Sequence, residues 1–356
     1  MTGQEAVELI HQEAWTGRTP GLSRTTELLR RVGDPHKKLR FVHITGTNGK
    51  GSTAAMVASV LIQSGRKTGL YTSPHLWRFH ERFQVNGQPI PDDTLGRIAE
   101  QVIQAARGME DPATEFELMT AVGMLYFAET QCDIVVLEVG LGGRLDATNV
   151  IPAPQSLAML TSDRDGQTFL YRGQGPFHIG LLGEYQVFNA TTAIEICWAL
   201  RRNGWPITDA ALAAGLSQAK WPARMELVRR NPDVILDGGH NPQCMEAIAE
   251  SLGKLYPGKK IWFLTGVLAD KDYPAMFRNI LPMAKGFVTI TPDSPRALSD
   301  QDLADYLRAQ GCEAVPCDSN QQGVDTVLKL AGPEDVVCIT GSLYMIGEVR
   351  HQLGLC

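Results

Sequence analysis

The sequence has no long apolar run and no excess of positive charge. No apolar stretch among its 356 residues reaches the roughly 18 needed to cross a bilayer, and Met1–Arg18 contains no signal-peptide core. We therefore expect a cytoplasmic protein with no membrane partner. The formal net charge of −6 disfavours a nucleic-acid partner, which would need a basic face. It does not disfavour ATP, because local geometry outweighs net charge at one phosphate site.

Cysteine is present, but not in a pattern that builds a site. The seven cysteines are scattered and include no C-x-x-C pair. This spacing excludes the usual structural zinc site and gives no disulfide framework, and it is typical of a reduced cytosolic protein.

Strand-like apolar runs alternate with helical patterns, which predicts an α/β fold with mainly parallel sheets. The length favours two domains, which we place at residues 1–225 and 226–356. The first should be a doubly wound, mainly parallel sheet with flanking helices, and the second a smaller Rossmann-like domain. A hinge is expected at Lys220–Arg224, because Pro222 disfavours a continuous helix there. Strands are expected at 39–44, 68–72, 133–138, 234–236, 261–264, 287–290 and 336–339.

A glycine-rich segment, T-G-T-N-G-K-G-S-T, follows the first strand and leads directly into a helix. Glycines allow successive backbone N–H groups to face phosphate oxygens, and the helix N-terminus adds a positive dipole end. Lys50 would reach the β- and γ-phosphates, and the Ser52 or Thr53 hydroxyl would lie near Mg²⁺. The alternative is a simple turn with an exposed lysine. The spacing is a variant of the P-loop, since Ile44 holds the place of its first glycine.

A carboxylate, Glu138, ends the apolar run 134–138 and precedes the glycine-rich segment 139–149. In a doubly wound sheet the carboxyl ends of the strands face the ligand, so Glu138 could hold Mg²⁺ or its water. Taken alone, an acid at a strand end can equally be a solvated terminus.

The segment E-V-G-L-G-G-R-L-D-A-T-N resembles the signature of folylpolyglutamate and dihydrofolate synthases of the Mur ligase superfamily. Further similar segments follow in the family's order along nearly the whole chain. They are T-S-P-H-L (72–76), L-L-G-E-Y-Q (181–186), W-P-A-R (221–224), D-G-G-H-N-P (237–242), G-V-L-A-D-K-D (266–272) and G-S-L-Y (341–344). The resemblance implies an ATP- and Mg²⁺-dependent ligase.

The resemblance also implies roles for individual residues. The ATP-binding residues would be Thr47, Asn48, Gly49, Lys50, Gly51, Ser52, Asn189, Arg224 and Asp237. Ser73 and Glu138 would be magnesium ligands, and Lys50, Glu138 and His240 would take part in catalysis. For Ser73 a turn before Pro74, and for His240 a capping role, remain alternatives. Substrate contacts would come from Thr114, Glu115, Phe116, Glu117, Leu145, Asp146 and Ala147.

One segment of the family pattern is missing after Ser162. In relatives the strand similar to 157–161 continues into a D-H pair and an E-K-A-G-I stretch, whose histidine and carbamylated lysine bind a second magnesium. Here Asp163–Phe169 follows at once and resembles sequence from well beyond that segment. Either the chain has a true deletion or the natural protein has a further stretch, and an intact mass compared with 38.9 kDa would decide.

We therefore expect ATP-dependent ligation of L-glutamate to dihydropteroate or to reduced folate glutamates, through an acyl phosphate. The partners are these small molecules, and a monomer is expected. Two alternatives stay open: another amide ligase of the superfamily, or a catalytically impaired ATP-binding relative if the deletion is real.

Overall fold

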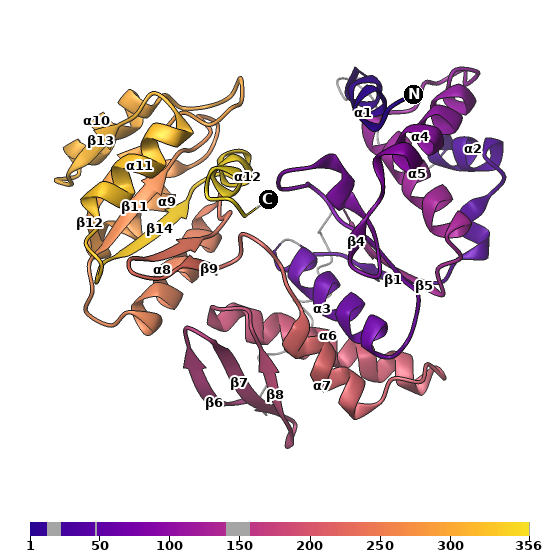
Figure 1. Cartoon of the computed structure of the whole chain (residues 1–356), viewed down its shortest axis with the longest axis horizontal. Coiled ribbons are helices and arrows are strands. Elements are labelled where there is room, and N and C mark those ends of the chain that lie inside the picture. The colour runs from indigo at the N-terminus through magenta and orange to yellow at the C-terminus, as the bar shows by residue number, and fades with distance from the viewer. Residues whose placement is uncertain (13–22, 47, 140–156, 356) are drawn as a thin grey trace. The chain divides into compact units, whose positions relative to one another are not determined.

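The computed structural model describes residues 1–12, 23–46, 48–139 and 157–355 (Figure 1). The chain divides into two compact units. One comprises Met1–Pro152 with Thr192–Leu216, and the other Ala153–Thr191 with Ser217–Cys356. These units interleave along the chain, and the domain boundary expected after residue 225 stays a prediction.

The first unit contains a five-stranded sheet in the order β1-β5-β2-β3-β4. Strands β1 (Phe41–Ile44), β5 (Ile134–Glu138) and β2 (Thr68–Tyr71) are parallel, and β3 (Phe83–Val85) and β4 (Gln88–Pro89) add an antiparallel edge. This confirms the predicted mainly parallel sheet. Because β1, β5 and β2 run the same way, the segments after their carboxyl ends lie at one edge of the sheet.

Helices of the first unit pack their apolar faces on this sheet and on one another. They are α1 (Gly3–Gln12), α2 (Ser23–Arg31), α3 (Lys50–Gln63), α4 (Asp92–Ala106) and α5 (Glu115–Glu129), with short turns η1 (Pro35–Lys38) and η2 (Phe79–Arg82). Helix α3 is buried on nearly all sides and ends at Gln63, shortly before Gly65. Helices α6 (Glu184–Arg202) and α7 (Asp209–Gln218) each contribute to both units.

The second unit contains a six-stranded sheet in the order β13-β12-β11-β14-β10-β9. All pairs are parallel except β9 with β10, which confirms the Rossmann-like expectation. Its strands are β9 (Glu226–Arg229), β10 (Asp233–Leu236), β11 (Ile261–Thr265), β12 (Ala284–Thr289), β13 (Ala314–Pro316) and β14 (Val336–Thr340). Its helices are α8 (Pro242–Leu255), α9 (Tyr273–Arg278), α10 (Asp300–Ala309), α11 (Asn320–Leu330) and α12 (Leu343–Gln352), with the turn η4 (Leu281–Met283).

A separate three-stranded antiparallel sheet joins β6 (Leu157–Asp163), β7 (Gly166–Tyr171) and β8 (Gln174–Ile179). The strand expected at residues 157–161 is therefore β6, and it pairs with β7 in this separate sheet. The chain reverses at once after β6, because the N–H of Asp165 donates to the Asp163 carboxylate at 2.8 Å. As an edge strand β6 is exposed, and the side chain of Leu160 reaches 52% exposure.

Candidate active site

The glycine-rich segment connects β1 to α3, at the position where the sequence predicts a phosphate loop, and is called the phosphate loop below. Gly49 caps the helix with φ of +79°, a conformation that glycine adopts without strain. The Lys50 ammonium donates a hydrogen bond to the carbonyl of Gly46 at 2.7 Å, which holds the lysine over the loop. Thr47 lies outside the described residues.

Hydroxyl groups line the start of helix α3. Ser52 and Thr53 are both buried, and Oγ1 of Thr53 has no hydrogen-bond partner in the part of the chain that the structure describes. A buried hydroxyl without a partner is costly, so this group fits a phosphate oxygen or the ligand sphere of Mg²⁺.

Glu138 lies beside this loop. In the register of the parallel pair, Ile44 at the end of β1 is opposite Glu138 at the end of β5. On the other side of β5, the backbone N–H of Ser73 donates to Oε2 of Glu138 at 3.3 Å. The three parallel strands therefore bring together the phosphate loop, Ser73 and Glu138.

The donor set at this edge fits magnesium. Glu138 is a buried carboxylate and Ser73 a hydroxyl, both of them hard oxygen ligands. No cluster of three or more His, Cys, Asp or Glu side chains suited to a metal occurs within the described ranges. An ion held by Ser73 and Glu138 would therefore complete its shell with water and phosphate oxygens, as Mg²⁺ commonly does.

A buried arginine, Arg82, lies at the end of η2 near this edge. Its Nε–H donates to Nδ1 of His75 at 2.8 Å, and its guanidinium lies over the Phe79 ring, 5.5 Å from the centroid. Arg82 is 8% exposed, yet among the described residues no acceptor takes a hydrogen bond from Nη1 or Nη2. A buried cation without a carboxylate partner is suited to bind an anionic ligand.

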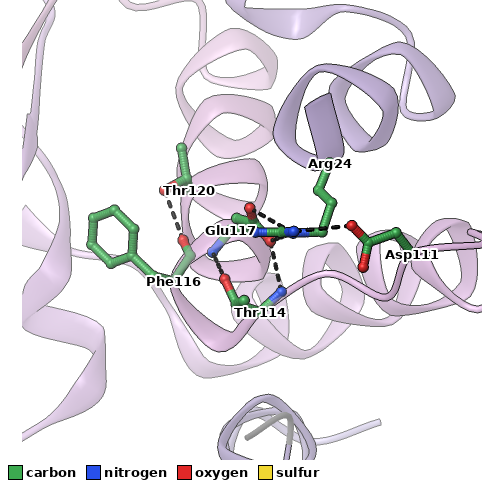
Figure 2. Close-up of polar contacts among 6 residues, drawn as sticks. All are labelled: Arg24, Asp111, Thr114, Phe116, Glu117 and Thr120. Carbon is green, nitrogen blue, oxygen red and sulfur yellow. Dashed lines mark hydrogen bonds and ion pairs between the residues drawn. The ribbon is translucent and has the colours of Figure 1, made fainter. Parts of the chain in front are cut away.

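The predicted substrate segment, Thr114–Glu117, forms the start of helix α5 (Figure 2). Thr114 caps the helix: its hydroxyl accepts from the Glu117 N–H at 3.3 Å, while the Glu117 carboxylate accepts from the Thr114 N–H at 2.8 Å. Both oxygens of Glu117 also accept from Nε of Arg24, at 3.1 and 3.0 Å. The Glu117 side chain is therefore engaged in holding α2 and α5 together.

Glu115 differs from Glu117, because its side chain is more accessible. Its carboxylate pairs with Nδ1 of His11 at 2.9 Å, and that hydrogen bond is the main cause of a lowered pKa for Glu115. The remaining predicted substrate residues, Leu145, Asp146 and Ala147, lie outside the described residues.

Asp237 follows strand β10 in the second unit and is buried within a hydrogen-bond network. It accepts from the N–H of Gly239 at 2.8 Å, the N–H of Met225 at 2.9 Å and the hydroxyl of Tyr185 at 3.0 Å. Burial raises the pKa of the Asp237 carboxyl, and the nearby Arg224 charge opposes that shift in part. The carboxylate thus fixes the segment that carries Arg224.

Arg224 packs across Gly238. A Cβ added at Gly238 would lie 2.2 Å from Cδ2 of Leu343 and 2.7 Å from Nη1 of Arg224, so a larger residue there would require both side chains to move. The flanking Ala223 and Met225 have φ of 56° and 48°, a left-handed conformation that costs non-glycine residues roughly 1–3 kcal/mol. Arg224 also lines a cavity of about 990 Å³ within the second unit, bounded by residues 217–222 and strand β9.

His240 and Asn189 also lie in the second unit. Nδ1 of His240 is 2.9 Å from the carbonyl of Gly238, which can only accept, so this nitrogen carries the proton and Nε2 holds a lone pair. Burial lowers the pKa of His240. The Asn189 amide donates to Oε1 of Gln186 at 2.9 Å.

Three residues described above were assigned no role by sequence reasoning: Arg82 and His75 in the first unit, and Tyr185 in the second. His75 and Tyr185 lie within the T-S-P-H-L and L-L-G-E-Y-Q segments, so a signal was present for both. No sequence pattern indicates Arg82, because its burial comes from packing on Phe79.

Comparisons with known proteins indicate which family this chain belongs to. Residues 223–343 match the family model of the Mur ligase glutamate ligase domain. A dihydrofolate synthase/folylpolyglutamate synthase of Bacillus subtilis is 30% identical, with 98% of this chain and 99% of the relative covered. A folylpolyglutamate synthase of Lacticaseibacillus casei is 31% identical, with 99% of both covered. The crystal structure of a Thermotoga maritima folylpolyglutamate synthase superposes with a TM-score of 0.86 at 27% identity, covering 99% of this chain and 96% of that one.

An α/β chain with a phosphate loop, a strand-end carboxylate and a glutamate ligase domain is an ATP-dependent carboxylate–amine ligase. This chain belongs to the folylpolyglutamate synthase/dihydrofolate synthase family, whose reaction uses ATP and Mg²⁺. Within the described ranges, none of its helices combines the length and apolarity needed to cross a membrane.

The chain is shorter than these relatives. The two alignments extend over 430 positions, whereas the chain has 356 residues, so at least 74 positions (430 minus 356) have no residue here. This agrees with the segment expected to be missing, whose location after Ser162 stays a prediction.

Proposed function

We propose that this chain joins L-glutamate to dihydropteroate or to a reduced folate glutamate, with release of ADP and phosphate. The observation that carries the proposal is the register that sets Glu138 beside the phosphate loop and Ser73. This arrangement suits the activation of a carboxylate by the γ-phosphate of ATP.

The first step forms an acyl phosphate. Lys50 and the loop N–H groups hold the β- and γ-phosphates while the folate carboxylate attacks the γ-phosphorus in line. Ser73 and Glu138 would hold Mg²⁺, which when bound neutralises phosphate charge. Glu115 and Phe116, with Leu145, Asp146 and Ala147, would contact the pteridine-bearing substrate. Thr114 and Glu117 would support binding of this substrate indirectly, because they fix the start of helix α5.

The second step forms the amide. The amine of L-glutamate attacks the acyl carbonyl and phosphate leaves. The Nε2 lone pair of His240 is suited to accept the proton that the amine loses. Arg82 would bind a carboxylate of L-glutamate, since the two glutamate carboxylates stay anionic while the folate carboxylate reacts.

Nucleotide contacts would also come from the second unit. Asn189, Arg224 and Asp237 lie there, and the network around Asp237 supports Arg224 as a preorganised cation. We further infer a cytoplasmic enzyme, supported by scattered cysteines that form no disulfide within the described ranges, and we infer a monomer.

A second candidate is a catalytically impaired ATP-binding relative. The 74 or more unmatched positions and the exposed apolar strand β6 favour it, because one magnesium site of the family would be unbuilt.

A coupled ADP-release assay separates the two candidates. An active ligase requires ATP, Mg²⁺, L-glutamate and either dihydropteroate or tetrahydrofolate, and omission of any one should abolish turnover. A chain that binds ATP by calorimetry but gives no glutamate-dependent ADP is the impaired relative. Turnover that does not need glutamate contradicts the ligase proposal itself.

A further inference from the structure

We propose that His75 donates a hydrogen bond from Nε2 to the L-glutamate carboxylate that Arg82 binds. The inference deepens the proposed function and rests on it. In this arrangement the neutral His75 ring, fixed in one tautomer, provides a hydrogen-bond donor beside the Arg82 guanidinium.

The hydrogen bond between Arg82 and His75 assigns the tautomer. A guanidinium nitrogen can only donate, so Nδ1 of His75, 2.8 Å from Nε of Arg82, must accept through its lone pair. In the neutral ring the proton then lies on Nε2. His75 therefore presents an N–H donor on the side of the ring away from Arg82.

The ring is held in place by its neighbours. His75 packs edge-on against Phe79 with centroids 5.9 Å apart, and Arg82 lies over the same Phe79 ring at 5.5 Å. The following loop is fixed because the Glu81 carboxylate accepts from the N–H groups of Leu76 and Arg78, each at 2.8 Å. Such a support positions a donor before a ligand arrives.

Two adjacent side chains thus have donors without an acceptor. In the part of the chain that the structure describes, neither Nε2 of His75 nor the Nη groups of Arg82 make a hydrogen bond within the protein. A carboxylate has two oxygens and about four lone pairs, so it can accept from both side chains together. His75 also lies only two residues beyond Ser73, at the same edge of the sheet as Glu138.

Two conservative variants separate the direct role from support of Arg82. His75→Asn places an amide oxygen near the Nδ1 position, so Arg82 keeps its acceptor while the distal donor is lost. His75→Gln places an amide N–H near the Nε2 position, while the Arg82 Nε–H loses its acceptor. We expect His75→Asn to raise the KM for L-glutamate about tenfold, the effect of one hydrogen bond to a charged group, with the KM for ATP and folate within about twofold. The KM for L-glutamate should rise less in His75→Gln than in His75→Asn, because the distal N–H donor is retained.

The reverse pattern overturns the inference. If His75→Asn behaves as wild type while His75→Gln is impaired, His75 acts only through Arg82. If all three KM values change together with the Tm, its role is structural.

A spectroscopic measurement keeps the inference testable without turnover. In ¹⁵N-histidine-labelled full-length protein, His75 should show a protonated Nε2 whose resonance shifts when L-glutamate is added with an ATP analogue and Mg²⁺. A shift without ligation would mean that the proposed function fails and the donor assignment stands. A protonated Nδ1, or no response in an enzyme that turns over, would refute the assignment.

Discussion

The backbone N–H of Ser73 donates to the Glu138 carboxylate at 3.3 Å, although 65 residues separate them along the chain. Parallel pairing of β2 with β5 produces this contact, because Tyr71 and Leu137 are opposite each other just before the two strands end. The pairing therefore places Ser73 and the buried Glu138 at the same edge of the sheet as the phosphate loop.

Glu138→Gln should therefore impair catalysis more than stability. The amide keeps the shape of the side chain but removes a hard anionic ligand for Mg²⁺. We expect glutamate-dependent ADP release to fall on the order of 100-fold, with a Tm change of only a few degrees. Coupled kinetics and a thermal melt check this. If the fall in ADP release is accompanied by a large decrease in Tm, the role of Glu138 is structural.

Lys50→Ala should weaken ATP binding on the order of 100-fold, because a charge-assisted contact to phosphate is lost while the backbone loop remains. Isothermal titration with a non-hydrolysable ATP analogue measures this. Lys67→Ala, at an exposed lysine just after α3, is the matched control and should bind as wild type. Unchanged affinity in the Lys50 variant would show that the loop does not hold the nucleotide.

Arg224→Ala and Asp237→Ala should each weaken ATP binding about tenfold or more, the second through loss of the network that fixes Arg224. Tyr185→Phe removes only one of three donors to Asp237, so we expect a smaller loss of affinity. Arg229→Ala, on the neighbouring strand β9, is the control. Calorimetry that finds both alanine variants equal to the control would remove Arg224 and Asp237 from the nucleotide site.

The partly buried His240 should make stability depend on pH. Its folded pKa is lowered from 6.5 by burial, so the unfolded chain binds the proton more readily. The stability that the neutral ring contributes is complete above about pH 6.5 and is lost as the pH falls through the lower, folded pKa. Urea unfolding from pH 8 to pH 5 should show wild type losing free energy relative to His240→Gln below pH 6.5. A difference that is constant across this range would contradict the assignment.

Thr114→Ala should destabilise the protein by about 1 kcal/mol, the usual cost of losing a helix N-cap. Thr114→Ser keeps the hydroxyl and should therefore retain most of the wild-type free energy of unfolding. Denaturant unfolding compares the three proteins. If Thr114→Ala instead leaves stability unchanged and raises only the KM for folate, the residue contacts substrate directly.

Local sequence determined the elements that bear the chemistry. Glycines at the required positions and the alternation of apolar runs predicted the phosphate loop, and the strand before Glu138 was predicted to within a residue. These features depend on neighbouring residues in the chain, so a pattern can reveal them.

The tertiary structure alone decided what the other side chains do. Glu117 stands in a predicted substrate segment, but Arg24, 93 residues away, engages its carboxylate. Tyr185 reaches Asp237 across 52 residues, and β6 joins a separate sheet because the chain turns back immediately after it. Which acid is engaged, which arginine is buried without a carboxylate partner and which tautomer a histidine adopts all depend on groups brought together by packing. No spacing along the sequence records those contacts.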